Sequence, residues 1–216
     1  MLEIIPGILA HSLEEYLLRL EVVSQSQSEW VHIDIMDGQF VPNISVMPHE
    51  LVSLTNLLHG EAHLMTFRPE RYFSDLAVGG ISRVLLHREA FDSFEECAKV
   101  LKSAGDYFSE VGLVINPNTS VESLLELPIQ VVQCMGVQPG ASGQQFVTAA
   151  YDTIQKVAAQ RLDCTLAVDG AVNEETILGL QQSGITRFIM SSQLFSQGNL
   201  DENISHFNRI LQGGSL

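Results

Sequence analysis

WVHIDIMDG, Trp30 to Gly38, is the most informative stretch of the sequence. Most of its residues are apolar or β-branched, and it ends at a glycine, which is typical of a buried strand that runs into a turn. His32, Asp34 and Met36 alternate, so they share one face of that strand. An imidazole and a carboxylate on a buried face are costly unless they are paired or bind a metal. The stretch therefore predicts a strand whose inner face carries chemistry.

Short apolar runs of the same kind recur along the 216-residue chain and alternate with longer, helix-like stretches. Near-continuous apolar strands suit a parallel sheet that is covered by helices. Eight such strand–helix units in this length are the number for a (β/α)₈ (TIM) barrel, and we predict an α/β single domain of this kind over residues 1–216. The expected strands are Leu2–Ile5, Trp30–Met36, Ala62–Met65, Arg83–His87, Glu110–Ile115, Gln130–Met135, Cys164–Val168 and Arg187–Met190.

Helix signals lie between these strands. Ser12 followed by Glu15 forms a capping box, and Asp92 is the expected cap of a second helix. A third helix follows Asn173 and stops at Gly184, a residue that often ends helices. The expected helices are Ser12–Val23, Phe91–Ser103, Ser120–Leu127, Glu174–Ser183 and Asn203–Leu211.

A doubly wound open sheet is the competing fold. It usually carries a G-x-G-x-x-G turn after its first strand. The first turn expected here is PGILA, Pro6 to Ala10, which does not fit that pattern. The barrel is therefore the better prediction.

The charge balance excludes one class of partner. The chain has 11 Lys plus Arg against 26 Asp plus Glu, a formal net charge of −15, and no basic cluster that would bind nucleic acid. An anionic substrate would not be attracted by this overall charge. Its site must hold it with local backbone N–H groups.

Cellular location is predicted from cysteines and apolar runs. Cys97, Cys134 and Cys164 form no C-x-x-C pair and are typical of reduced thiols in a cytoplasmic protein. The N-terminal MLEIIPGILA lacks the basic region of a signal peptide. No apolar stretch reaches the roughly 18 residues of a membrane span. We expect a cytoplasmic protein with no membrane partner.

Polar residues at the strand ends are the candidate site, because barrel enzymes place their sites at the C-terminal ends of strands. His32 and Asp34 are joined by His63 in AHLM and by Asp169 in LAVDG. These four residues come from three strands and converge only if the barrel closes. Two nitrogens and two carboxylates suit one divalent metal ion: zinc, iron(II), manganese or cobalt.

The two aspartates indicate a reaction type. An epimerase removes a proton from one face of a carbon and returns one to the other face, which needs two acid–base groups on opposite sides. A divalent ion beside the ketone oxygen stabilises the enediolate between the two transfers.

The sequence resembles the ribulose-phosphate 3-epimerase family along essentially its whole length. HIDIMDG is a highly specific match, whereas an Asn-Pro pair alone would be weak. The motifs that carry the resemblance are HIDIMDG (His32–Gly38), FVPN (Phe40–Asn43), HLM (His63–Met65), PERY (Pro69–Tyr72), Asn116-Pro117 and VDG (Val168–Gly170).

The resemblance implies a metal-dependent isomerase of carbohydrate metabolism that acts on a small sugar phosphate and forms homo-oligomers. Asp34 is implied as the base on one face and Asp169 as the acid on the other, with the roles exchanged in the reverse reaction. His87 matches a histidine common after strand four, with a structural or supporting role. The implied metal ligands are His32, Asp34, His63 and Asp169, and the implied site-lining residues are Met36, Met65, Met135 and Gly7.

The substrate end departs from the family pattern. GVQPGASGQ (Gly136–Gln144) replaces a pattern close to SVNPGFGGQ, DGAV replaces DGGV, and PGILA replaces PSILS, so that Gly7 lacks a hydroxyl. A serine or alanine in place of glycine restricts backbone approach to a phosphate, because only glycine takes a positive φ without cost. The phosphate candidates, mostly through backbone donors, are Gly140, Ser142, Gly143, Gly170, Ala171, Ser191 and Ser192.

The sequence leaves three functions open. The first is C3 epimerisation of D-ribulose 5-phosphate to D-xylulose 5-phosphate or, alternatively, of another ketose phosphate such as a hexulose 6-phosphate. The second is a decarboxylase or aldolase with a D-x-K-x-x-D strand motif, but Met36 stands where its lysine is needed. The third is a non-catalytic metal-binding relative, which the retention of both histidines and both aspartates disfavours.

Overall fold

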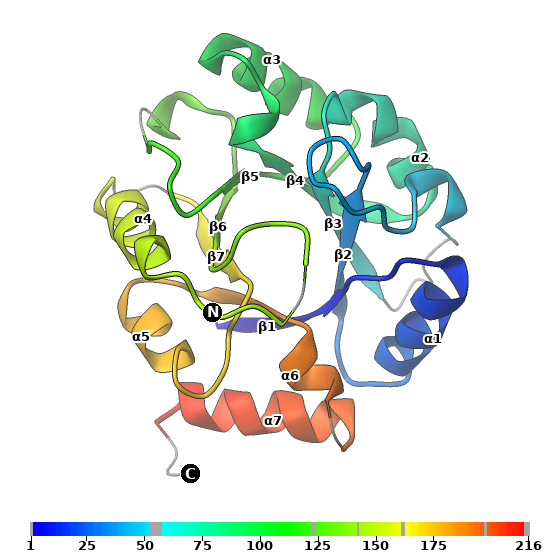
Figure 1. Ribbon diagram of the computed structural model, residues 1–216, viewed down its shortest axis with the longest axis vertical. Coiled ribbons are helices and arrows are strands. Elements are labelled where there is room, and N and C mark those ends of the chain that lie inside the picture. The colour runs from blue at the N-terminus through cyan, green and yellow to red at the C-terminus, as the bar shows by residue number, and fades with distance from the viewer. Residues whose placement is uncertain are drawn as a thin grey trace.

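The computed structural model describes residues 2–51, 58–121, 124–141, 143–160, 163–196 and 198–213. Its strands pair in parallel and in sequence order, and β8 closes on β1 to complete a barrel (Figure 1). The predicted (β/α)₈ barrel is confirmed. The strands are β1 (Glu3–Ile8), β2 (Trp30–Met36), β3 (His59–Met65), β4 (Ile81–His87), β5 (Glu110–Ile115), β6 (Val131–Met135), β7 (Thr165–Asp169) and β8 (Arg187–Met190).

Helices ring the outside of the barrel, and the two C-terminal ones lie side by side (Figure 1). In the described part of the chain, none of them is long and apolar enough to cross a membrane. The α-helices are α1 (Leu13–Ser24), α2 (Phe73–Val78), α3 (Phe94–Ala104), α4 (Thr148–Ala159), α5 (Ile177–Gln182), α6 (Ser192–Phe195) and α7 (Leu200–Leu211). The 3₁₀ helices are η1 (Pro48–Glu50), η2 (Pro69–Tyr72), η3 (Arg88–Ala90) and η4 (Leu124–Glu126).

The caps of α1 and α3 follow the same chemistry, and one of the two was predicted wrongly. The Ser12 hydroxyl accepts the Glu15 N–H at the start of α1, as expected. In α3 the cap is Ser93, whose hydroxyl accepts the Glu96 N–H at 3.0 Å. Asp92 lies one residue too early, and its own N–H donates to the Glu96 carboxylate.

The expected turn at PGILA is also wrong, because β1 continues to Ile8. Pro6 pairs with Met190 and Gly7 pairs with His32. Gly7 does not take a positive φ, so here the Pro-Gly pair stays extended. In the predicted helix Ser120–Leu127, the described residues form only η4; α5 begins three residues later than predicted and α7 three residues earlier.

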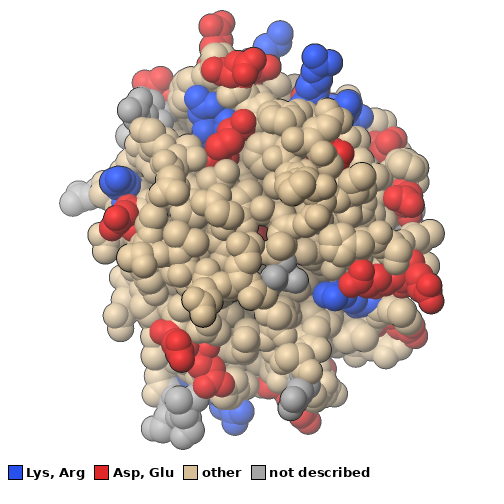
Figure 2. All heavy atoms as spheres, viewed as in Figure 1, with Lys and Arg blue, Asp and Glu red and all other residues tan. Residues whose placement is uncertain are grey.

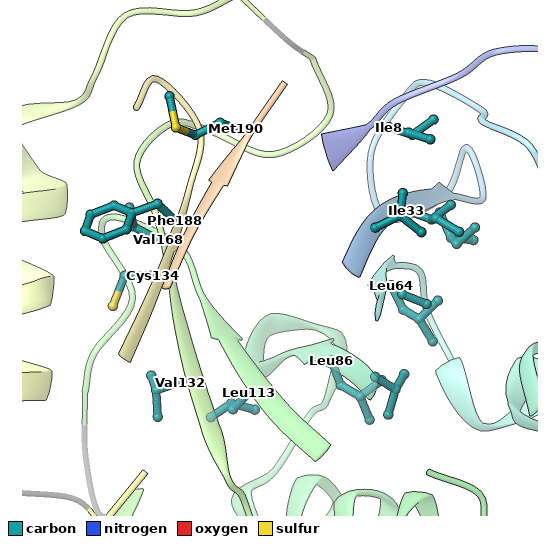
Figure 3. Close-up of a cluster of buried hydrophobic side chains, with 14 of the residues drawn as sticks. Ile8, Ile33, Leu64, Leu86, Leu113, Val132, Cys134, Val168, Phe188 and Met190 are labelled. Atoms are coloured by element: carbon teal, nitrogen blue, oxygen red, sulfur yellow. The ribbon is translucent and has the colours of Figure 1, made fainter. Parts of the chain in front are cut away.

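The main hydrophobic core lies between the barrel and its helices. Alternate strand residues such as Ile33, Leu64 and Leu86 point outward and are fully buried there (Figure 3). Each such side chain contributes roughly 1.5–3 kcal/mol when it leaves water. Since neighbouring strand residues face opposite ways, the intervening residues point into the barrel. The polar residues of β2 and β3 are therefore inside it.

Close packing in the barrel interior explains Gly112 on β5. A Cβ atom at this position would lie 2.4 Å from Leu85 Cδ2 and 2.9 Å from Val131 Cβ. Leu85 and Val131 belong to a small buried cluster with Met135. The interior has no space for even one more methyl group at this level.

We predict that Gly112→Ala lowers the free energy of unfolding by about 1–3 kcal/mol, the usual cost of overpacking a core. Chemical denaturation measures this loss. Gly105→Ala is the matched control, because Gly105 ends α3 in the right-handed region and its Cβ would have open space except near one carbonyl oxygen. Equal unfolding midpoints for the two variants would contradict this view of the interior.

Candidate active site

The side chains of β2, β3 and β7 converge at the C-terminal end of the barrel. Strand register places Asp34 directly beside His63. Asp169 is the last residue of β7, and His32 lies on the inner face two residues before Asp34. One ligand atom from each of these four residues lies within 4.8 Å of all the others. The structure thus brings together the four residues that the sequence predicted as a cluster.

In this cluster, one ring nitrogen of each histidine lies close to a carboxylate oxygen of each aspartate. His63 Nδ1 lies 2.9 Å from Asp34 Oδ1 and 3.3 Å from Asp169 Oδ2. His32 Nε2 lies 3.4 Å and 3.7 Å from the same two oxygens. Both histidines are fully buried, whereas the aspartate side chains are about 15% exposed. The aspartates therefore form the solvent-facing side of the cluster.

The cluster fits a divalent cation. His32 Nε2 is buried and has no hydrogen-bond partner among the described residues, although it points at two carboxylates. A buried polar atom without a partner is costly, and a bound cation would use its lone pair. Two imidazole nitrogens and two carboxylate oxygens suit zinc, manganese, iron(II) or cobalt.

Without a metal, the cluster holds protons. Burial by itself lowers the pKa of His32, but the nearby carboxylates of Asp34 and Glu61 outweigh it and raise the pKa to about 10. The pKa of His63 is also raised, because the carboxylates of Asp169 and Asp34 outweigh the effect of burial. Conversely, the two imidazoles hold the pKa of Asp34 below its ordinary value despite burial. A metal ion must displace these protons to bind.

His87 and Glu89 extend the contacts of His63 on the side of its ring away from the two aspartates. Its Nε2 lies 2.8 Å from His87 Nε2, and His87 Nδ1 lies 3.1 Å from the Glu89 carboxylate. Burial lowers the pKa of His87 to about 4, so His87 is neutral at pH 7. Glu89 in turn accepts the Asn116 N–H and the Thr119 hydroxyl. His87 therefore lies between His63 and Glu89, a position from which it can play the supporting role expected of it.

A pocket of roughly 610 Å³, counted to its open mouth, lies above the cluster. It is lined by Asp34, His63 and Asp169 and by loops that follow β6, β7 and β8. Met36 and Gly7 lie just outside the lining: Met36 packs in a buried cluster with Leu9, and a Cβ on Gly7 would be 3.7 Å from Ser191 Cβ. Ser142 lies outside the described residues. The other predicted residues that line the pocket are Met65, Met135, Gly140, Gly143, Gly170, Ala171, Ser191 and Ser192.

At Ala171 the loop backbone keeps a conformation that a glycine would favour. Ala171 has a φ of +56°, in the left-handed region that strains an alanine, and it follows Gly170 at +97°. The N–H groups at the start of the segment before α5 are occupied within the chain. The Asn173 N–H donates to Thr176 Oγ1, and the Asn173 side chain accepts the Glu175 N–H.

Among its described residues, the pocket offers an anion no lysine or arginine side chain. The face that surrounds the barrel mouth is mostly uncharged, and charged groups gather at its periphery (Figure 2). An anionic group would therefore be held by backbone N–H groups and hydroxyls, as the charge balance predicts.

Sequence reasoning missed several groups that contact the site. The Gln133 amide, on the strand before Asp169, lies 3.5 Å from Asp169 Oδ2. Glu61 contacts His32 from β3, and Leu9 and Gln144 line the pocket. Glu61 and Gln133 alternate with the outward-facing residues of their strands, which is the one signal that could have placed them inside the barrel.

Comparisons with known proteins agree with this geometry. The family model described as "Ribulose-phosphate 3 epimerase family" matches residues 3–195. The chain is 29% identical to the ribulose-phosphate 3-epimerase of Bacillus subtilis, with 95% of this chain and 97% of that protein covered. It is 30% identical to the enzyme of the same name from Chlamydia pneumoniae, with 90% and 88% covered. A tryptophan synthase alpha-subunit structure from Pyrococcus furiosus superimposes with a TM-score of 0.64 over 99% of this chain and 100% of that one, but at 14% identity it shows the fold alone.

We predict that Zn²⁺ or Mn²⁺ raises the thermal midpoint of the metal-free protein, and that His63→Gln weakens binding at least tenfold. Because the ion displaces protons from His32 and His63, its affinity falls as the pH is lowered. Thermal unfolding across metal concentrations and pH measures both effects.

The control for this prediction is His206→Gln, which removes a partly exposed histidine on α7 that pairs with Glu174 and is not part of the cluster. It should bind metal as the unmodified protein does. A thermal midpoint that does not respond to any divalent ion would contradict the site.

Proposed function

The chain belongs to the ribulose-phosphate 3-epimerase family, and we propose that it inverts C3 of a ketose phosphate, with D-ribulose 5-phosphate and D-xylulose 5-phosphate as its substrate pair. Family membership makes it an isomerase that acts on carbohydrates. The substrate pair and the roles of the individual residues are what we propose beyond that membership. The observation that carries them is the placement of Asp34 and Asp169 on two sides of one cluster.

The two aspartates reach the cluster from strands that are not neighbours. Asp34 extends from β2 and Asp169 from β7, and β1 and β8 separate these strands in the barrel. Both carboxylates also line the pocket. A substrate carbon held above the cluster can therefore be approached by one carboxylate on each face.

Each aspartate carries out one of the two proton transfers. Asp34 takes the proton from C3, and the electron pair of the C–H bond moves into a C2–C3 double bond with charge on the C2 oxygen. Asp169, which starts protonated, returns a proton to the opposite face of C3 and restores the ketone. In the reverse reaction the roles are exchanged. Exchange with solvent resets both carboxyl groups before the next turnover.

His32, Asp34, His63 and Asp169 would hold the metal. When bound, a divalent ion would supply positive charge next to the ketone oxygen and so stabilise the enediolate. The buried histidines contribute two neutral ligands, and their fixed rings keep both carboxylates close to each other. The pocket wall of Met65, Met135 and Ile189 excludes water from the reacting carbon.

We assign the phosphate to the loop end of the pocket. Gly140, Gly143 and Gly170 have positive φ values and line this end, and Ser191 and Ser192 add hydroxyl groups. Ala171 keeps the turn geometry at the cost of strain. This arrangement supports a phosphate ester, while the length of the sugar is decided by experiment.

We predict that the metal-loaded protein, given D-ribulose 5-phosphate in D₂O, forms D-xylulose 5-phosphate with deuterium at C3. Asp34→Asn is expected to abolish this exchange while it keeps the fold, because an amide cannot accept the C3 proton. NMR of the sugar follows both the product and the label, and metal content is measured in parallel to separate loss of the base from loss of the ion.

Asp106→Asn is the charge-matched control, because Asp106 is an exposed loop residue that follows α3. Residual exchange above a few per cent in metal-loaded Asp34→Asn would mean that Asp34 is not the base. Exchange only with a hexulose 6-phosphate would change the substrate and keep the mechanism. No exchange with any ketose phosphate would leave a metal-binding protein without this activity.

A further inference from the structure

Beneath the metal cluster, the N-terminal half of the barrel is ionic. Arg187 on β8 is 3% exposed, and its guanidinium contacts carboxylates from three other strands. These strands lie apart around the barrel, so the side chains meet in its interior. The ion pairs join Arg187 with Glu3 at 2.7 Å, Glu61 at 3.2 Å and Glu110 at 2.8 Å, and Arg83 with Glu3 at 3.3 Å and Glu110 at 3.1 Å.

One member of this layer touches the site above. Glu61 is fully buried, and its Oε1 lies 2.8 Å from His32 Nδ1. Strand register makes this contact direct, because Glu61 and His32 are paired residues of β3 and β2. Arg187 binds the other carboxylate oxygen of Glu61. The contact between Glu61 and His32 Nδ1 therefore joins these ion pairs to the metal cluster.

We propose that Glu61, oriented by Arg187, is the positioning residue that sets the tautomer of His32 and thereby its readiness to bind the metal. Nδ1–H of His32 donates to the Glu61 carboxylate, which has only acceptors to offer. Once the metal has displaced the second ring proton, the lone pair of His32 lies on Nε2, the buried atom that faces Asp34 and Asp169 without a hydrogen-bond partner. This inference rests on the proposed metal site and adds a residue that acts through a ligand.

His63 is held in the opposite tautomer. Its Nδ1 faces the aspartates, while its Nε2 lies against His87 Nε2. His87 donates its Nδ1–H to Glu89, so its Nε2 accepts the Nε2–H of His63. The two metal-facing nitrogens are thus Nε2 of His32 and Nδ1 of His63, each fixed by a carboxylate on its far side.

Glu61→Gln tests this role sharply, since the amide has the same shape as the carboxylate. Arg187 has only donors, so the carbonyl oxygen of the introduced amide would face Arg187 and its NH₂ group would face His32 Nδ1. A donor in that place favours the tautomer with its proton on Nε2, which opposes metal binding. Hydrogen-bond partners of metal-bound histidines are commonly worth 10–100-fold in affinity, and we expect Zn²⁺ to bind Glu61→Gln weaker by that factor.

Two further variants separate positioning from stability. Glu110→Gln removes another carboxylate from Arg187 without touching His32, so it should lower the free energy of unfolding while zinc affinity stays unchanged. Glu61→Asp keeps two acceptor oxygens and should recover most of the affinity that Glu61→Gln loses. Zinc affinity is measured by competition with a chelating dye, and unfolding of the metal-free proteins by urea.

Equal zinc affinity in Glu61→Gln and the unmodified protein would overturn the inference, as would an equal loss in Glu110→Gln. The unmodified protein gives an independent test by ¹⁵N NMR of its zinc-loaded histidine rings. We expect a protonated Nδ1 in His32 and a protonated Nε2 in His63; the same tautomer in both would overturn the inference even if Glu61→Gln does not fold. Failure of the unmodified protein to bind any divalent ion would instead overturn the proposed metal site on which the inference rests.

Discussion

Four polar side chains share one buried space at the end of the barrel, and the need to neutralise them constrains the rest of the structure. Two imidazoles and two carboxylates within 4.8 Å of one another are unfavourable in a protein interior unless they exchange hydrogen bonds, protons or a cation. Barrel closure makes this arrangement possible, because β2 and β7 are far apart in sequence and their inward side chains converge only when β8 pairs with β1. The same closure places a pocket directly above the cluster.

The supporting groups follow from the same constraint. Each metal-facing imidazole leaves a second ring nitrogen that also needs a partner, and the barrel supplies one in both cases. His32 contacts Glu61 directly, and His63 contacts His87, which in turn contacts Glu89. A carboxylate below the site needs compensation in turn, which Arg187 provides for Glu61. The ionic layer thus continues, into the lower half of the barrel, the neutralisation that begins at the cluster.

Repeating residue patterns predict the strands and the barrel, whereas individual caps, turns and side-chain contacts depend on neighbours that such patterns do not identify. Strand alternation places His32, Asp34 and Met36 on one face, and the recurrence of strands and helices predicts the barrel that brings Asp169 to them. Two local predictions were wrong. Ser93 rather than Asp92 caps α3, and Pro6-Gly7 stays in β1 because the neighbouring strands β2 and β8 pair with it. The contact between Arg187 and Glu61 spans 126 positions and depends on strand register inside a closed barrel, which residue patterns do not contain.

The proposed chemistry depends on the identity of the metal-binding atoms, which X-ray absorption by the zinc-loaded protein measures directly. We predict coordination by nitrogen and oxygen only, with two imidazoles at about 2.0–2.1 Å and carboxylate oxygens at about 2.0–2.2 Å. The Cys134 thiol belongs to the core between barrel and helices and cannot contribute. A sulfur neighbour at about 2.3 Å, or coordination without imidazole, would contradict the site and the chemistry proposed for it.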